Sequence, residues 1–146
     1  MIKFFAPLFF ENKISLSVYA SKLETNGAKL EAYFAHVGDI PTSRRVLRHI
    51  VAIERWGLSR LRMLLGEKPV QLDSSKAYYP AETTAWSVLL TDFKDVRREL
   101  VALTPFLESA KGKVAHNMMG DLSPRAWLKY LDFHANAESS RVRVKK

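Results

Sequence analysis

Cysteine is absent from the 146 residues of this sequence. Its absence excludes disulfides, cysteine-ligated zinc, iron–sulfur clusters and a cysteine nucleophile, and it fits a reducing compartment, so we expect a cytoplasmic protein. Any metal ligand or nucleophile has to come from another residue type. A folded chain of this length buries roughly two thirds of the surface that its unfolded form exposes, so a core can form without disulfides or a structural metal.

Long hydrophobic runs are also lacking. The longest candidate, from Phe4 to Phe10, ends at Glu11 and is far shorter than the roughly 18 residues that cross a bilayer. We therefore expect no transmembrane helix and no membrane association. No clear cleavage pattern of a signal peptide follows this run. We expect residues 1–12 to be a segment that packs on the fold, within one domain that spans residues 1–146.

Acidic residues are outnumbered by basic ones, with 15 Asp and Glu against 23 Lys and Arg and a formal net charge of +8. The basic residues are spread through the chain, apart from a cluster in the tail at 142–146, and this pattern favours solubility over nucleic-acid binding. The sequence has no helix-turn-helix spacing, no aromatic-basic strand motif and no zinc finger. Nucleic acid is therefore not the partner that we expect.

Hydrophobic residues recur at three- and four-residue steps in four segments, each of which predicts an amphipathic helix. The first segment runs from about residue 13 to residue 37 and ends before Gly38. Its start is open, because residues 14–20 also alternate like a strand, and Ser21 with Glu24 could form a capping box one turn later. The sequence thus predicts the helix without deciding where it begins.

The second segment carries the clearest hydrophobic stripe. Thr42 or Ser43 can cap the helix, and Gly66 ends it. The hydrophobic spacing of the third segment predicts a helix over residues 86–103. Pro105 is expected to end this helix or to kink it. Two well-bounded helices are therefore expected in the middle of the chain.

The connection over residues 67–81 has no helical period, and its length is typical of a functional loop and permits one crossover. Ser123 followed by Pro124 is a strong helix start, so the fourth helix is predicted from there to about Arg141. No pair of strands with a hairpin turn is apparent. Four amphipathic helices, none able to bury its stripe alone, predict an all-α fold, an antiparallel or crossover four-helix bundle.

Polar residues occupy the expected core face of the fourth helix at His134 and Glu138. Residues four apart lie about 5–6 Å from each other on one helix face, so both side chains could bind one ion. His49 lies one residue off the hydrophobic stripe of the second helix and could face them. Two histidines and one glutamate with an open position are a competent set for catalytic zinc, and they also suit iron and other divalent ions.

A structural interpretation of these residues remains open beside the metal site. A histidine near a hydrophobic stripe is often half-buried with one backbone hydrogen bond. Glu138 could pair with Arg141, Arg45 or Arg48 near one end of the bundle. His36, close to the end of the first helix, is explained by the helix dipole.

Two longer stretches resemble a known family. These are His49-Ile-Val-Ala-Ile-Glu-Arg-Trp-Gly and, ahead of His134, His116-Asn-Met-Met-Gly-Asp-Leu-Ser-Pro-Arg-Ala-Trp-Leu. Their order and spacing resemble those of the DinB-like family of four-helix bundles, from about the first helix to Arg141. The resemblance implies a divalent metal, held by one histidine of the second helix and two of the fourth. It places the ligands at His49, His134 and Glu138.

The third of these ligands departs from the family, which has histidine where this chain has Glu138. A carboxylate shifts metal preference toward harder ions, and the alternative is a ligand set that has decayed. His116 matches the family's turn motif, and we expect it to cap or pack before the helix start at Ser123 rather than to bind metal.

Characterised members of this family include S-transferases that use bacillithiol or mycothiol and a mycothiol-dependent isomerase, and others are described as metal-dependent hydrolases. The resemblance thus implies a thiol S-transferase or hydrolase that uses zinc, nickel, iron or manganese. Its small-molecule substrate, such as a low-molecular-weight thiol, would enter from the nearby bundle end. The alternative is a non-catalytic, homodimeric scaffold in which Phe4, Phe5, Phe9 and Phe10 cover a partner. We expect a homodimer in either case.

Overall fold

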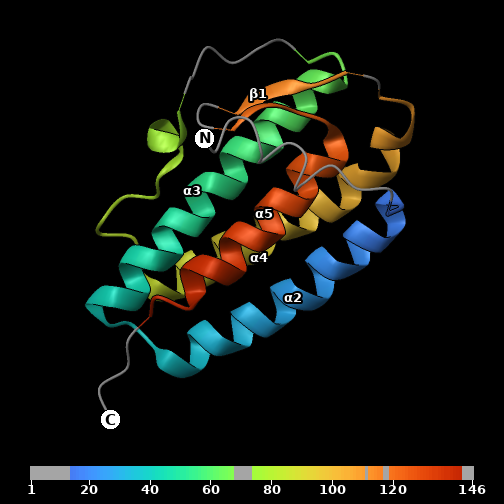
Figure 1. The fold of residues 1–146 in the computed structure, drawn as a ribbon. Coiled ribbons are helices and arrows are strands. Elements are labelled where there is room, and N and C mark those ends of the chain that lie inside the picture. The colour runs from blue at the N-terminus through green and yellow to red at the C-terminus, as the bar shows by residue number, and fades with distance from the viewer. Residues whose placement is uncertain (1–13, 68–73, 111, 117–118, 143–146) are drawn as a thin grey trace.

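The computed structural model describes residues 14–67, 74–110, 112–116 and 119–142. Within them four long helices pack as a bundle, which confirms the predicted fold class (Figure 1). They are α2 (Leu16–Val37), α3 (Pro41–Leu64), α4 (Trp86–Leu103) and α5 (Pro124–Ser139). Two short 3-10 helices follow α3 and α4, namely η1 (Ser75–Tyr78) and η2 (Thr104–Ser109). The predicted N-terminal segment and the tail beyond Val142 lie outside the described residues.

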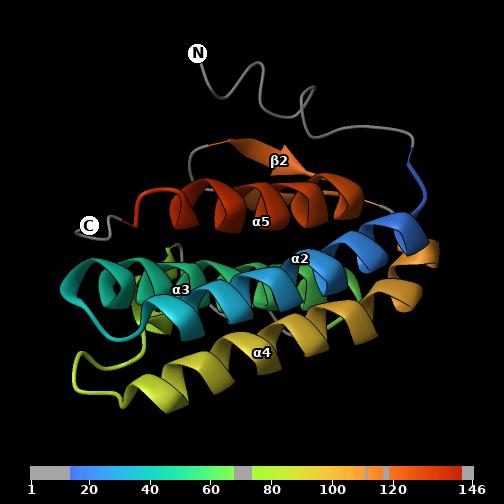
Figure 2. The ribbon, with the colours of Figure 1, turned by 90° about the horizontal axis from the view of Figure 1, so that it is seen from below.

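The bundle contains one crossover. The connection between α3 and α4 returns the chain along the bundle, so that these two helices run in the same direction and α2 and α5 run opposite to them (Figures 1 and 2). Each of α2 and α3 packs against both α4 and α5, which places α2 and α3 across the diagonal. Of the two arrangements left open by the sequence, antiparallel or crossover, the structure has the crossover that the length of residues 67–81 permits.

One of the two predicted helix caps is confirmed. The prediction that Thr42 or Ser43 caps α3 is wrong: α3 begins at Pro41 after Ile40, so both residues lie inside its first turn, and the hydroxyl of Ser43 instead accepts the backbone N–H of Ile40. At α5 the Ser123 hydroxyl accepts the N–H of Ala126, as its place before a proline predicted. The first helix begins at Leu16, so the strand-like alternation there does not form a strand.

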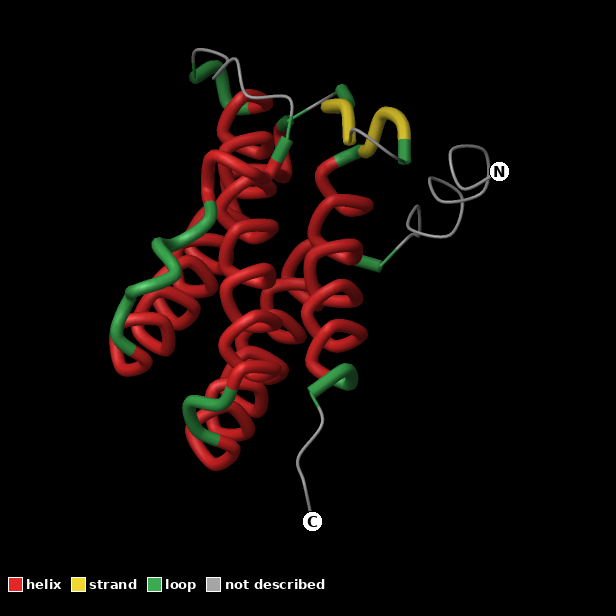
Figure 3. Tube along the Cα trace, turned by 90° about the vertical axis from the view of Figure 1, so that its left-hand side faces the viewer, coloured by secondary structure: helices red, strands yellow, loops and turns green. Residues whose placement is uncertain are grey.

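The expectation that the chain has no strand pair is wrong. The strands β1 (Val114–His116) and β2 (Gly120–Leu122) form an antiparallel hairpin in which Val114 pairs with Leu122. Figure 3 shows the two strands at one end of the bundle. Strands of three residues are too short to display a period of two, which is why the sequence did not reveal them.

A buried ion network separates two hydrophobic clusters in the bundle interior. Arg97 donates two hydrogen bonds to the carboxylate of Glu54, at 2.7 and 2.8 Å, and a third to Asp132 at 3.0 Å. It also donates to the carbonyl oxygen of Leu23, and the amide of Asn26 donates to Asp132 at 2.7 Å. The network joins all four helices midway along the bundle, so each charge has a partner.

The helices α3 and α5 approach closely at Gly57. A Cβ atom at this position would lie 2.7 and 2.8 Å from the two methyl carbons of Leu131, whose side chain is fully buried. Any larger residue at this position would therefore force the side chain of Leu131 to move. In the described part of the chain, no helix has the length and hydropathy required to span a bilayer.

Candidate metal centre

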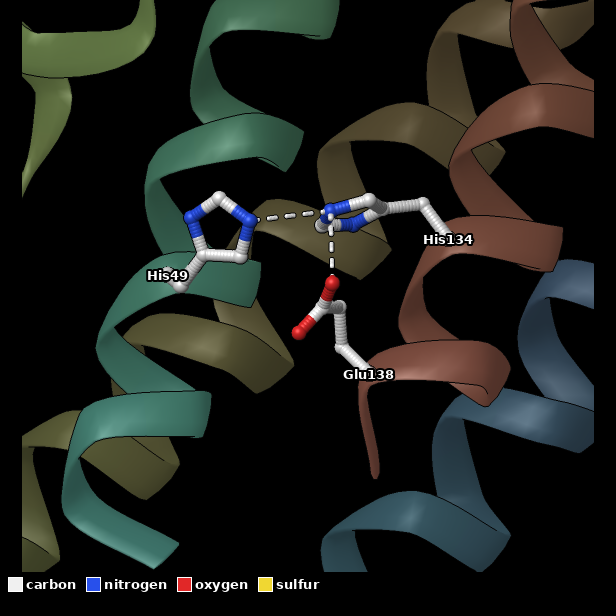
Figure 4. A group of neighbouring side chains, drawn as sticks. All are labelled: His49, His134 and Glu138. Atoms are coloured by element: carbon white, nitrogen blue, oxygen red, sulfur yellow. Dashed lines mark hydrogen bonds and ion pairs between the residues drawn. The ribbon is translucent and has the colours of Figure 1, made fainter. Parts of the chain in front are cut away.

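The three residues predicted to bind metal come together between α3 and α5. His49 on α3 points toward His134 and Glu138 on α5, as Figure 4 shows. The Nε2 atoms of the two histidines are 3.1 Å apart, and His134 Nε2 is 4.0 Å from Glu138 Oε1. One ligand atom from each residue lies within 4.8 Å of the others. Residues 85 positions apart in the sequence thus form one cluster.

This spacing fits a small cation. Two ligand atoms that are each about 2.0–2.1 Å from a tetrahedral zinc ion are about 3.3 Å from each other. The two imidazole nitrogens, 3.1 Å apart, are close to that separation. The glutamate oxygen is slightly farther away, on a flexible side chain that is partly exposed. Nitrogen and carboxylate donors of this kind suit zinc, iron, nickel and manganese.

Burial keeps both histidines in the state that a metal requires. Burial, with smaller contributions from the nearby His49, His116 and Arg141, lowers the pKa of His134 to about 3. Burial also lowers the pKa of His49, although the charge of Glu138 opposes this effect. Both imidazoles are therefore neutral at pH 7, and neutral imidazole is the form that binds metal ions.

Tyr79, which follows η1, orients the ring of His49. Its hydroxyl forms a hydrogen bond with His49 Nδ1. When Nδ1–H is donated to the phenol oxygen, the lone pair of Nε2 is free to face His134. Burial raises the pKa of Tyr79, so the phenol stays protonated at neutral pH. Sequence reasoning missed this residue, and the only signal was its place in the long connection at 67–81.

Arg48 holds Tyr79 in this position. Its Nε and Nη2 atoms donate hydrogen bonds of 3.0 and 2.8 Å to the carbonyl oxygen of Pro80. Its guanidinium carbon also lies 5.6 Å from the centre of the Tyr79 ring. Together these contacts attach the connection to α3 at the residue directly before His49.

His134 is held differently. Its Nδ1 atom is buried and has no hydrogen-bond partner in the part of the chain that the structure describes. The ring packs beside Tyr130, with the ring centres 5.7 Å apart, and meets His49 edge-on at 4.9 Å. Ring packing, together with the 3.1 Å hydrogen bond between its Nε2 and that of His49, therefore sets the direction of its Nε2.

A cavity of about 290 Å³ opens beside the cluster. The predicted pair between Glu138 and Arg141 is present, with Arg141 Nε 3.8 Å from Glu138 Oε2. Glu138 therefore lies between a histidine and an arginine, and the structural interpretation and the metal interpretation of this residue are compatible. The cavity is lined by Arg45, Val46, Arg48, His49, Tyr79, Glu138 and Arg141.

His116 is a packing residue, as predicted, and does not join the metal cluster. It lies in β1, almost fully buried, with its ring centre 4.9 Å from that of Trp56 and 4.6 Å from that of Tyr130. The backbone N–H of Met119 donates to its Nδ1 at 3.2 Å. Its burial lowers its pKa to about 4.

The structure therefore shows a four-helix bundle in which two histidines and one glutamate form a cluster that could hold a metal ion. Comparisons with protein-family models, curated proteins and solved structures found no match to this chain.

Proposed function

We propose that the protein is a metal-dependent enzyme of the DinB-like kind, a thiol S-transferase or a hydrolase. His49, His134 and Glu138 hold the divalent ion. The observation that carries this proposal is the convergence of three ligand atoms, from two helices, within 4.8 Å of one another beside a cavity. Structural zinc sites are closed by four protein ligands, whereas catalytic sites have three and leave a position open. The arrangement here is of the second kind.

The residues around the ion have separate tasks in this proposal. A divalent ion in such a site acidifies a bound water or thiol, or polarises a carbonyl group. His49 and His134 provide neutral nitrogen ligands, and Glu138 contributes one negative charge. Tyr79 keeps the His49 ring in the ligating orientation, and the cavity admits a small molecule such as a low-molecular-weight thiol.

Metal content is the direct test. We would measure it by mass spectrometry on protein purified without an affinity tag or chelator, for the wild type and for His134→Ala and Glu138→Ala. Near-stoichiometric zinc, nickel, iron or manganese in the wild type, lost in both variants, is the expected result. His36→Ala is the matched control, because His36 is exposed at the end of α2. Wild-type protein that is empty and also fails to bind any of the four added metals would refute the proposal.

A second proposal is a non-catalytic bundle that acts as a homodimeric scaffold. It is supported by two large exposed side chains, Phe106 and Phe133, which are 64% and 50% accessible. The N-terminal phenylalanines that first suggested this function lie outside the described residues. A scaffold predicts a dimer in light scattering that Phe133→Ser dissociates, and no specific stabilisation by metal. An enzyme predicts about 2.7 kcal/mol of stabilisation at a hundredfold excess of metal over its dissociation constant.

For either function we propose a cytoplasmic location, which fits a chain without cysteine.

A further inference from the structure

We infer that the substrate of this site carries an oxyanion group, a carboxylate or a phosphate, and that Arg45 and Arg141 bind it next to His49. As a statement about the substrate, this rests on the metal-dependent function proposed above. The oxyanion subsite itself is formed by side chains of the chain and does not require the metal.

The charge of the cavity is strongly unbalanced. Three arginines and one glutamate are the charged residues that line it. A divalent ion at the cluster would add two more positive charges. Because like charges around a small cavity repel each other, a neutral ligand would leave this repulsion in place, whereas an anionic ligand would relieve it.

The arginines near the cavity differ in how many hydrogen bonds and ion pairs their guanidinium groups already form within the protein. Arg44, just outside it, forms a two-point pair with Asp39, at 2.8 Å in both bonds, and also donates to two backbone carbonyl oxygens. Arg48 donates twice to Pro80 and covers the Tyr79 ring. These two guanidinium groups have structural roles.

Arg45 and Arg141 are not engaged in this way. Arg45 is exposed and has no acidic partner among residues 14–67, 74–110, 112–116 and 119–142. Arg141 is exposed as well, and it forms one long ion pair, in which its Nε lies 3.8 Å from Glu138 Oε2, beyond hydrogen-bonding distance. Two guanidinium groups, one from α3 and one from just beyond α5, thus have N–H donors left for a ligand at one cavity.

Guanidinium chemistry identifies the ligand class. Its planar fork of N–H donors matches the two oxygens of a carboxylate or a phosphate. The cavity, at about 290 Å³, is near the lower end of the range for small-molecule sites. His49 and Tyr79 line the same cavity, so an oxyanion held by the arginines brings the rest of the molecule to the candidate metal ligands.

Inorganic phosphate is the probe for the first experiment. Metal-free protein would be titrated with phosphate at constant ionic strength, with binding followed by amide NMR shifts. We expect saturable shifts around His49 and Tyr79. Arg45→Gln and Arg141→Gln should each weaken binding about fivefold, which is the effect of one partly exposed charge pair.

The matched control is Arg98→Gln. It removes the same charge from an exposed position on α4, where Arg98 lies 3.6 Å from Asp95. This variant should bind phosphate like the wild type. An equal loss of affinity in Arg98→Gln, or the absence of saturable shifts in the wild type, would overturn the inference, because only the net charge of the protein would then attract phosphate.

Metal content measured on the same proteins separates this inference from the proposed function. Arg45→Gln and Arg141→Gln should retain metal, and the zinc-loaded wild type should bind phosphate more tightly than the metal-free protein. A protein that binds metal but not phosphate overturns the inference and leaves the metal-dependent function standing. Saturable phosphate binding by a protein that takes up no metal supports the oxyanion subsite and overturns the metal-dependent function.

Discussion

Tyr79→Phe removes a single oxygen atom from the candidate metal centre. In the native protein that oxygen forms the hydrogen bond to His49 Nδ1, and the ring is fixed separately by Arg48, whose guanidinium carbon is 5.6 Å from the ring centre. Phenylalanine keeps the ring and this contact. The substitution therefore tests the orientation of His49 without disturbing the packing of the connection.

The expected effect is a 10- to 100-fold loss of metal affinity, or about 1.4–2.7 kcal/mol, which is usual when the partner of a metal-binding histidine is lost. His134 has no such partner at Nδ1 among the described residues, so Tyr79 provides the hydrogen bond that orients this histidine pair. In the metal-free protein the same change removes one hydrogen bond and should cost about 1 kcal/mol of unfolding free energy or less.

Competition with a chromophoric chelator measures the affinity, and urea unfolding of the metal-free protein measures the stability. Tyr33→Phe, at an exposed position on α2 outside the cavity, should leave the affinity unchanged. Arg48→Lys should lower it in the same direction as Tyr79→Phe, because lysine lacks the planar fork that fixes Pro80 and the ring. Wild-type affinity in Tyr79→Phe would refute the claim that this phenol orients His49.

Three further predictions concern the bundle. Gly57→Ala should destabilise the protein by about 1–3 kcal/mol in urea unfolding, because its methyl group would overlap the buried Leu131, and an unchanged midpoint would contradict the close approach. Arg97→Met should cost about 3–5 kcal/mol in the same assay, since Glu54 would be left buried without its partner, and a neutral result would mean that water reaches the site. Because burial lowers the pKa of His116 to about 4, the unfolded chain binds more protons than the folded one below pH 6.5. Stability should therefore fall by about 1 kcal/mol between pH 6.5 and pH 5 on account of this residue, after allowance for solvent screening, and His116→Phe should reduce the slope.

The helices and their ends were predictable because they depend on neighbours in sequence. The three- and four-residue period identified all four helices, and Gly38, in a left-handed conformation with φ of 81°, ends α2 where expected. Ser123 begins α5 by the hydrogen bond that its position suggested. Each of these signals acts within one helical turn. The hairpin at Val114–Leu122 was missed because its strands are too short to show a pattern.

Two of the three candidate ligands are placed by the sequence in the same way. His134 and Glu138 are four residues apart on one helix, so helical geometry alone places them on one face. His49 is a different case, since its position one residue off the stripe was compatible with the interior or with the edge of the bundle. Its Nε2 lies 3.1 Å from that of His134 only because α3 packs against α5, and the absence of a side chain at Gly57 lets these two helices approach closely.

The surroundings of the site were decided by tertiary structure alone. Tyr79 lies 30 residues from His49, in a connection without periodicity, and reaches it because the crossover passes over α3 and Arg48 holds it there. The availability of Arg45 and Arg141 depends on which neighbouring arginines find partners, and this is a property of the folded surface. Local sequence determines helices and their faces, whereas contacts between distant segments depend on how the whole bundle packs, and the chemistry of this cavity is built from such contacts.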